Sequence, residues 1–337
     1  MTLLIPVAAV MAFVLTGLIR KNALANNQLD YPNERSSHTQ PTPRGAGMAV
    51  AIVFSCGLIV LWLANKTSNE NFYTLLFPGL MAALIGRLDD IGKLTSAKWR
   101  LLGHFGLALT AVWLAGGLPP LPIASQNLEF GIVGDALAIV YLVWMLNLFN
   151  FMDGIDLITA IETITICIAT ALLLIMKTDS TIWLILAVLG ASVLGFAFLN
   201  LPPAKIFLGD VGSGFIGLTL AVISIIVAKD EPLIAWAFVI MFGVFVADST
   251  VALGRRIVGK ETVYVAHRTH AYQRLAVKMQ NHLPVSIGVA AINLLWLLPI
   301  SWLVVDKQIL PIVGLLIAYV PLVVTALILQ SGKPLAT

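Results

Sequence analysis

Charged residues are scarce in this chain: they make up 11% of its 337 residues, whereas typical soluble domains contain about 25%. Hydrophobic residues make up 59% of the chain, and the mean hydropathy is +0.95. This balance comes close to excluding a soluble fold and indicates a polytopic membrane protein. Cysteine is also rare. Cys56 and Cys167 both lie in apolar stretches, which favours two small core side chains over a disulfide or a metal pair.

Long apolar runs dominate the sequence instead. A helix of about 20 apolar residues can cross a bilayer, and about eleven such runs are present. We therefore predict an all-α fold in one transmembrane domain over residues 1–337. The expected spans lie near 2–20, 46–64, 72–88, 100–116, 134–150, 157–176, 182–200, 212–228, 233–253, 284–304 and 309–329.

The basic residues are distributed unevenly between the two sets of loops. Sixteen of the twenty Lys and Arg residues fall on one set, which the positive-inside rule places in the cytoplasm, with the N-terminus outside. This asymmetry accounts for the net charge of +3, and no interleaving of aromatic and basic residues indicates nucleic-acid binding. The predicted cytoplasmic loops lie near 21–46, 87–99, 150–156, 201–211 and 254–283.

The notable polar clusters all fall on this predicted cytoplasmic side. One is "NLFNFMDGID", in which Asn150, Asp153 and Asp156 recur every third residue between apolar flanks. A buried carboxylate is costly unless it is paired, hydrogen-bonded or bound to a metal. The pattern fits a Mg²⁺ site completed by substrate phosphates, and it fits equally a network of amides and carboxylates that pins helix ends together.

Two further acidic motifs lie on the same side. Asp89 and Asp90 end a predicted span and are followed by Lys93 and Arg100, a grouping that suits a phosphate headgroup; an ordinary solvated helix end is the alternative. Asp210 lies in "FLGDVGSG", where small residues allow close approach of a ligand or a backbone. The helix after this motif offers N–H groups suited to a phosphate, and a simple Asp helix cap is the alternative.

The last polar loop ends in "AHRTHAYQRL". His267 and His270 have the i, i+3 spacing of zinc ligands, but two ligands without a third make zinc a weak interpretation. A loop that binds phosphate and sugar through Arg268 is favoured, with Arg255 and Arg256 nearby as additional anion partners.

These segments together resemble the polyprenyl-phosphate N-acetylhexosamine-1-phosphate transferases, in particular the branch that initiates O-antigen synthesis. The resemblance runs from about residue 29 to 275 through "PTPRGAG", "LDDIGK", "NLFNFMDGID", "NLPPAKIFLGDVGSG" and the histidine-bearing loop. There are two departures. The usual "DGIDGL" is "DGIDLI" here, so that a glycine is missing after Asp156, and the usual run of histidines is "HRTH".

The resemblance implies an active site on the cytoplasmic face of a bacterial inner-membrane protein, often a homodimer. A UDP-N-acetylhexosamine would donate its sugar 1-phosphate to undecaprenyl phosphate among the membrane lipids, with release of UMP and with Mg²⁺, or Mn²⁺ in its place, as cofactor. Asn150 and Asp210 match the metal ligands. The expected catalytic residues are Asp89, Asp90, Asp153, Asp156 and His267. The expected substrate-binding residues are Arg44, Lys93, Arg100, Asn200, Arg256, Arg268 and His270.

Two other functions stay open at this point. A transporter or flippase of lipid-linked sugars would carry ionisable residues in mid-span, where Glu162 and His104 are the candidates. A membrane phosphatase acting on prenyl pyrophosphates could use a similar acidic cluster. Because a phosphate monoester has its second pKa near 6, direct attack by the lipid phosphate is favoured over a route through a phospho-aspartate.

Overall fold

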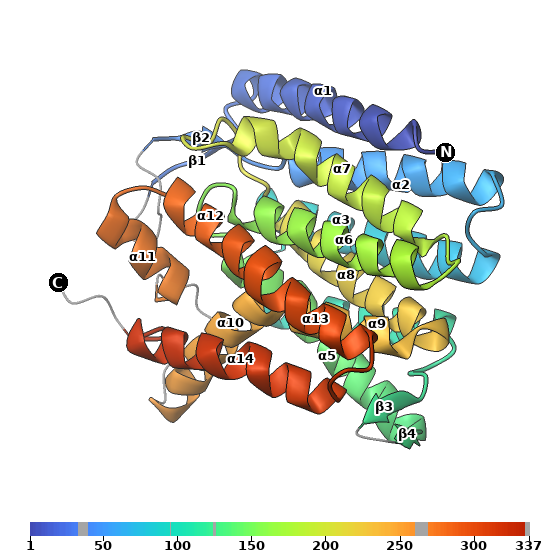
Figure 1. Cartoon of the computed structure of the whole chain (residues 1–337). Helices are drawn as coiled ribbons and strands as arrows, with labels where there is room; N and C mark the ends of the chain where they lie inside the picture. The colour runs from blue at the N-terminus through green and yellow to red at the C-terminus, as the bar shows by residue number, and fades with distance from the viewer. Residues whose placement is uncertain (33–39, 95, 124–125, 260–268, 334–337) are drawn as a thin grey trace.

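The computed structural model describes residues 1–32, 40–94, 96–123, 126–259 and 269–333. Long helices run side by side through the protein, and the N-terminus and the β3–β4 ribbon lie at the end of the bundle opposite α11 (Figure 1). The elements in chain order are α1 (Leu4–Ala25), β1 (Leu29–Asp30), β2 (Thr42–Pro43), α2 (Gly47–Leu63), α3 (Asn69–Asp90), α4 (Ala97–Leu114), β3 (Leu121–Ile123), β4 (Gln126–Leu128), α5 (Gly131–Met152), α6 (Ile158–Lys177), α7 (Ile182–Asn200), α8 (Asp210–Asp230), α9 (Pro232–Met241), α10 (Gly243–Val258), α11 (Ala271–Met279), α12 (Leu283–Ile292), the π-helix η1 (Asn293–Leu297), α13 (Leu298–Val305) and α14 (Pro311–Ile328).

The prediction of an all-α membrane fold is confirmed. Each of the expected spans coincides with helix, and the strands of the described residues form only two two-stranded ribbons. Within the described ranges, eight helical segments are long and apolar enough to cross a membrane. A ninth is added if α9 and α10, which meet at a bend of 59°, count as one span. This is fewer than the eleven expected, because α2 has only 17 residues and α4 does not meet the same criteria.

Helix α8 forms the centre of the protein. It packs against α2, α3, α5 and α9. The most apolar stretch of α8 is buried along its whole length, whereas the corresponding stretches of α1 and α14 are only 17% and 22% buried. A helix that is apolar on every side belongs in the interior. The first residue of α8 is Asp210, so this carboxyl group lies at one end of the central helix.

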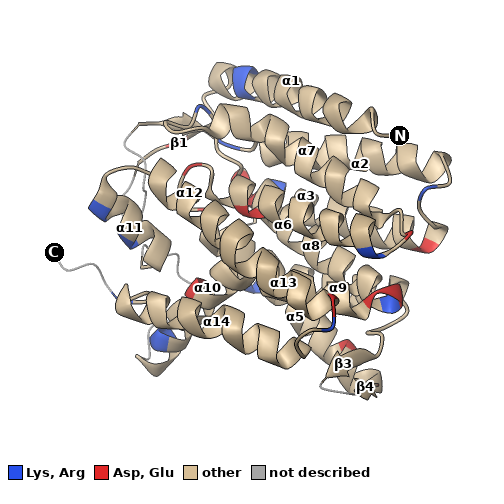
Figure 2. Ribbon diagram, in the orientation of Figure 1, with Lys and Arg blue, Asp and Glu red and all other residues tan. Residues whose placement is uncertain are grey.

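The charged residues gather toward the two ends of the bundle, and the middle of the long helices is almost free of them (Figure 2). At the end opposite the predicted cytoplasmic loops, Lys177 forms an ion pair with Asp306, and Lys229 forms one with Glu70. Both pairs join loops that the sequence placed in the same set. The two ion pairs agree with the sorting of these loops, and the assignment of each set to one side of the membrane stays a prediction.

A buried carboxyl group lies inside a long helix, about one turn from its beginning. Glu162 on α6 is fully buried, and its Oε2 accepts a hydrogen bond of 2.7 Å from Nδ2 of Asn293. The same Nδ2 lies 2.8 Å from the Thr165 hydroxyl. Asn293 begins the π-helix η1, a kind of helical irregularity that often marks a functional or specially packed position. Glu162 is thus part of an interhelical polar contact between α6 and η1.

We predict that Asn293→Leu destabilises the protein by about 1–3 kcal/mol, because it leaves a buried carboxyl group without its donor. The double variant Glu162→Met with Asn293→Leu removes both partners and should recover most of this loss. Thermal unfolding of the detergent-solubilised protein measures both effects. A double variant less stable than Asn293→Leu would contradict this account of the pair.

Candidate active site

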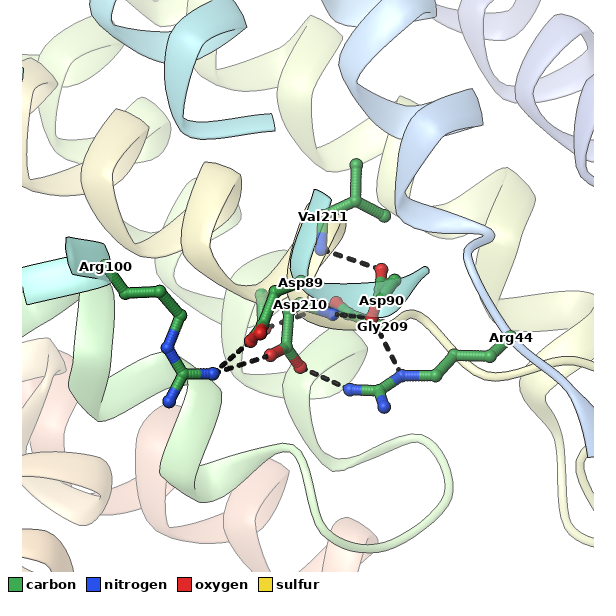
Figure 3. Close-up of polar contacts among 8 residues, drawn as sticks. Arg44, Asp89, Asp90, Arg100, Gly209, Asp210 and Val211 are labelled. Carbon is green, nitrogen blue, oxygen red and sulfur yellow. Dashed lines mark hydrogen bonds and ion pairs between the residues drawn. The ribbon is translucent and has the colours of Figure 1, made fainter. Parts of the chain in front are cut away.

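The acidic end of α3 meets the beginning of α8 in the interior of the protein (Figure 3). The backbone N–H groups of Asp210 and Val211 donate hydrogen bonds of 3.0 and 3.1 Å to the two carboxylate oxygens of Asp90. The Asp90 side chain is only 2% exposed. Both oxygens of Asp90 therefore hold the first turn of α8, where a negative charge also faces the positive end of the helix dipole.

The N-terminal amides of α8 are consequently not free for a phosphate, contrary to the expectation from sequence. Two of them donate to Asp90, and the next two, of Gly212 and Ser213, donate to the carbonyl of Gly209. The N-cap of α8 is Gly209, so Asp210 is the first residue within the helix and not its cap. Its carboxylate is left to contact other side chains.

Arg44 joins Asp90 to Asp210. Its Nε lies 2.9 Å from Oδ1 of Asp90, and its Nη2 donates to Oδ1 of Asp210. Burial opposes the charge of this guanidinium, but the carboxylates of Asp210 and Asp90 prevail and raise the pKa of Arg44 above its ordinary value. Arg44 therefore stays charged between the two carboxylates.

Backbone pairing explains why Arg44 reaches this position. The amide of Phe207 donates to the carbonyl of Pro43 at 2.8 Å, and the amides of Gly45 and Ala46 donate to the carbonyl of Phe207 at 3.1 and 3.0 Å. The segment that ends in Arg44 thus runs beside the segment that leads into α8.

The glycines of the two motifs allow this close approach. A Cβ atom on Gly47 would overlap the Cα atom of Gly212, so the two backbones touch where α2 and α8 begin. The small residues of "FLGDVGSG" therefore accommodate a neighbouring backbone, one of the two alternatives left open by the sequence.

A second arginine lies on the other side of Asp210. Nη1 of Arg100 donates to Oδ2 of Asp89 and lies 4.0 Å from Oδ2 of Asp210. The side chains of Asp89 and Asn150 are both within hydrogen-bonding reach of the Asp210 carboxylate. The structure thus brings Asn150 and Asp210 together, as the metal assignment requires. Lys93 lies in the turn after α3 with its side chain exposed.

Asp153 comes directly after the last residue of α5 and lies close enough to Arg44, Asp90 and Asp210 for their charges to act on it. Burial raises the pKa of Asp153 to about 8, although the guanidinium of Arg44 favours the ionised form. The free protein therefore carries Asp153 mainly protonated near neutral pH.

Asn200 and Asp156 connect loops within the protein. The amide of Leu157 donates to Oδ1 of Asn200 at 2.7 Å, and Nδ2 of Asn200 donates to the carbonyl of Ile206 at 3.0 Å. Oδ2 of Asp156 accepts from the amide of Ala204 at 3.1 Å. Both side chains are buried. These contacts give Asn200 and Asp156 a role in holding the loop 153–157 against the loop 201–206.

The missing glycine of the "DGIDLI" motif has a structural consequence. Leu157 adopts a left-handed backbone conformation with φ +70°, which favours glycine. Its side chain is buried, with 7% of its surface exposed, and this burial offsets the backbone strain, since burying a leucine contributes about 1.5–3 kcal/mol.

The histidine-bearing loop is described only at its ends. His267 and Arg268 lie outside the described residues. Arg256 is buried on α10, and His270 is buried immediately before α11, with its Nδ1 3.5 Å from Oδ1 of Asp248.

Two residues that contact predicted site residues, Asp248 and His282, could not be recognised from the motifs. Asp248 on α10 accepts hydrogen bonds from the amides of Ala271 and Tyr272 at 3.0 and 3.1 Å. An acidic residue within the apolar run "FVADSTVAL" was the available signal, since a buried acid needs partners. The imidazole Nδ1 of His282 lies 3.2 Å from Oδ2 of Asp156, a contact that no local pattern indicates.

The side chains around Asp210 can be tested for their fit to a divalent cation. Four carboxyl groups, those of Asp89, Asp90, Asp153 and Asp210, face two guanidinium groups and the amide of Asn150, an excess of negative charge with oxygen donors. In the described part of the chain, no set of three or more His, Cys, Asp or Glu side chains is arranged to hold a metal ion. Mg²⁺ needs only one or two protein ligands, because it completes its shell with water and substrate phosphates, and the oxygen donors of Asn150 and Asp210 meet this requirement.

The long apolar helices define an integral membrane protein. A cluster of carboxyl, amide and guanidinium groups lies at one end of its central helix. The comparison with known proteins is specific: this chain belongs to glycosyl transferase family 4, whose model matches residues 72–228. The family resemblance inferred from the sequence motifs is therefore confirmed.

The similar proteins include several bacterial transferases. The chain is 30% identical, over 80% of its length and 75% of the relative's, to a protein of Bacillus subtilis named as a probable undecaprenyl-phosphate N-acetylglucosaminyl 1-phosphate transferase. It is 27% identical, over 80% of its length and 75% of the relative's, to a decaprenyl-phosphate N-acetylglucosaminephosphotransferase of Mycobacterium leprae. It is also 27% identical, over 74% of its length and 77% of the relative's, to a phospho-N-acetylmuramoyl-pentapeptide-transferase of Streptococcus pneumoniae.

We predict that Gly47→Ala destabilises the protein by about 1–3 kcal/mol, because the added methyl group forces α2 and α8 apart. Gly106→Ala is the matched control. It lies within α4 with open space around its Cα and should stabilise the helix by about 0.5–1 kcal/mol. Thermal unfolding compares the two; equal effects would contradict the close packing at Gly47.

A second prediction concerns pH. A carboxyl group whose folded pKa is raised to about 8 binds a proton that the unfolded chain releases near pH 4, so its contribution to stability is full below about pH 4 and is lost as pH rises toward 8. The unfolding temperature of the wild type should therefore fall between pH 5 and 8 more than that of Asp153→Asn, measured without divalent cations. Parallel pH profiles would contradict the protonated state of Asp153.

Proposed function

We propose that this protein transfers an N-acetylhexosamine 1-phosphate group from a UDP-sugar to undecaprenyl phosphate, with release of UMP. The names of its relatives support a polyprenyl-phosphate acceptor and an N-acetylated sugar phosphate. The observation that carries the proposal is the position of Asp210, which has Asn150 and Asp89 within hydrogen-bonding reach and lies between the guanidinium groups of Arg44 and Arg100.

The reaction brings two anions together, so electrostatic repulsion is its first barrier. An oxygen of the lipid phosphate attacks the phosphorus that bears the sugar, and the bond from that phosphorus to UMP breaks. Asp210 and Asn150 would hold Mg²⁺ or Mn²⁺. The bound cation would neutralise negative charge on the donor pyrophosphate and on the leaving UMP.

The chain's own residues would divide the remaining tasks. Arg100 is one-third exposed and Lys93 lies exposed on the neighbouring turn, so both can bind the phosphate of the lipid acceptor. Asp89 bonds to Arg100 and lies beside Asp210, which suits it to orient that acceptor. Asp90 would act indirectly, by holding Arg44 and the first turn of α8.

The position of the site suits substrates of unlike solubility. The residues around Asp210 come from the ends of α3, α5 and α8, so a lipid can keep its tail among membrane lipids while its phosphate meets a sugar nucleotide. The distribution of basic residues supports a site on the cytoplasmic face. Because most of the acceptor phosphate is doubly ionised at neutral pH, direct attack needs no general base.

One assay separates this proposal from a transporter and from a prenyl-pyrophosphate phosphatase. Purified protein is given a panel of UDP-N-acetylsugars, and UMP is measured with and without undecaprenyl phosphate and Mg²⁺. Release of UMP only when both are present supports the transferase. Release of inorganic phosphate from a prenyl pyrophosphate, or no turnover with any donor, would overturn it.

We predict that Asp210→Asn lowers kcat by about 10²- to 10³-fold, because it weakens the hold on the cation that neutralises the developing negative charge. Asp306→Asn is the matched control, since Asp306 pairs with Lys177 at the opposite end of the bundle. UMP release measures the effect, and the unfolding temperature verifies that both variants are folded. Near-normal turnover by Asp210→Asn would refute the metal assignment.

A further inference from the structure

Tyr272 reaches from α11 to the loop that carries Asp153. Its hydroxyl donates a hydrogen bond of 3.0 Å to the carbonyl of Phe151, in the last turn of α5. Carbonyl groups in the last turn of a helix lack partners within the helix, so the tyrosine satisfies one of them. A Cβ atom on Gly154 would overlap the same hydroxyl. The hydroxyl of Tyr272 thus touches the chain on both sides of Asp153.

The position of Tyr272 is set by a buried carboxylate. Oδ1 of Asp248 accepts from the amide of Ala271, and Oδ2 accepts from the amide of Tyr272. This is the arrangement that Asp90 makes with the first turn of α8. The ring of Tyr272 also stacks on His270, with 5.6 Å between ring centroids.

A distant segment of the chain completes this support. The hydroxyl of Ser331 donates to Oδ1 of Asp248, and the amide of Gly332 donates to the carbonyl of Thr269 at 2.8 Å. Nη1 of Arg274 on α11 donates to the carbonyl of Lys333 at 2.9 Å. The segment 330–333 is therefore attached to both α10 and the beginning of α11.

We infer that Tyr272 is a positioning residue for the Asp153 loop, held in place by Asp248 and the segment 330–333. The inference rests on the proposed function, because it assigns Tyr272 a part in the transfer reaction at that site. It accounts for the attachment of α11 to α5 by a side-chain hydroxyl, and for the burial of Asp248 among donors from two separate segments. The hydroxyl acts on Asp153 through the backbone at Phe151 and Gly154.

Tyr272→Phe removes this hydroxyl and keeps the aromatic ring. Tyr319→Phe is the matched control, because the hydroxyl of Tyr319 on α14 likewise donates to a helix carbonyl, that of Val239, at 2.6 Å. We expect Tyr272→Phe to lower kcat about tenfold with little change in the KM for undecaprenyl phosphate, since small displacements of reacting groups reduce rates by such factors. Tyr319→Phe should leave kcat unchanged, and both variants should unfold at similar temperatures.

A second pair tests the segment 330–333. Gly332 has φ +83°, and a Cβ atom there would lie 2.9 Å from Cα and from the carbonyl oxygen of Ala252, so Gly332→Ala should displace the segment. It should reproduce the lowered kcat of Tyr272→Phe. Gly254→Ala, where the surroundings are open, should match the wild type.

The outcomes separate the inference from the proposed function. If the wild type releases no UMP with any donor, the proposed function fails. If the wild type is active and Tyr272→Phe turns over like Tyr319→Phe, the inference is overturned while the function stands. A further double-mutant cycle is decisive: the kcat loss of Tyr272→Phe should shrink in an Asp153→Asn background, and full additivity would refute action through Asp153.

Discussion

The carboxylate of Asp90 lies where the last turn of α3 meets the first turn of α8, and both of its oxygens accept backbone amides of α8. This buried contact determines the position of Asp210, because Asp210 is the first residue of the helix that Asp90 holds. Arg44 adds a positive charge between the two carboxylates, without which two acids so close together would repel each other. The rest of the candidate site is arranged around this junction.

A second buried carboxylate holds the first turn of a helix in the same way. Asp248 holds the first turn of α11 as Asp90 holds that of α8, and in both cases a buried acid is stabilised by amides that a helix end leaves unpaired. The two junctions differ in the chemical group that each one positions. Asp90 places a carboxylate beside Asn150 and Asp89, whereas Asp248 places the hydroxyl of Tyr272 against the backbone at Phe151.

Much of the fold could be predicted from composition, since each expected span is helical. The juxtaposition of Asn150 with Asp210 was also anticipated from the family's motifs. The individual roles were harder to predict. Asp90 and Asn200 were expected to handle substrates, yet their buried oxygens accept backbone amides. Asp248 carried no motif and was missed, although it lies in an apolar run where a buried acid requires partners.

The sequence by itself determined which segments form long apolar helices, because a bilayer requires about 20 apolar residues per helix, and it predicted which loops share a side, because basic residues sort between the two faces. Only the tertiary structure decided which carboxylates accept backbone amides and which can contact other side chains or a ligand. The amides that donate hydrogen bonds to Asp90 lie 120 and 121 positions away along the chain. Local sequence spacing cannot predict these partners, because only the packing of α3 against α8 brings them together.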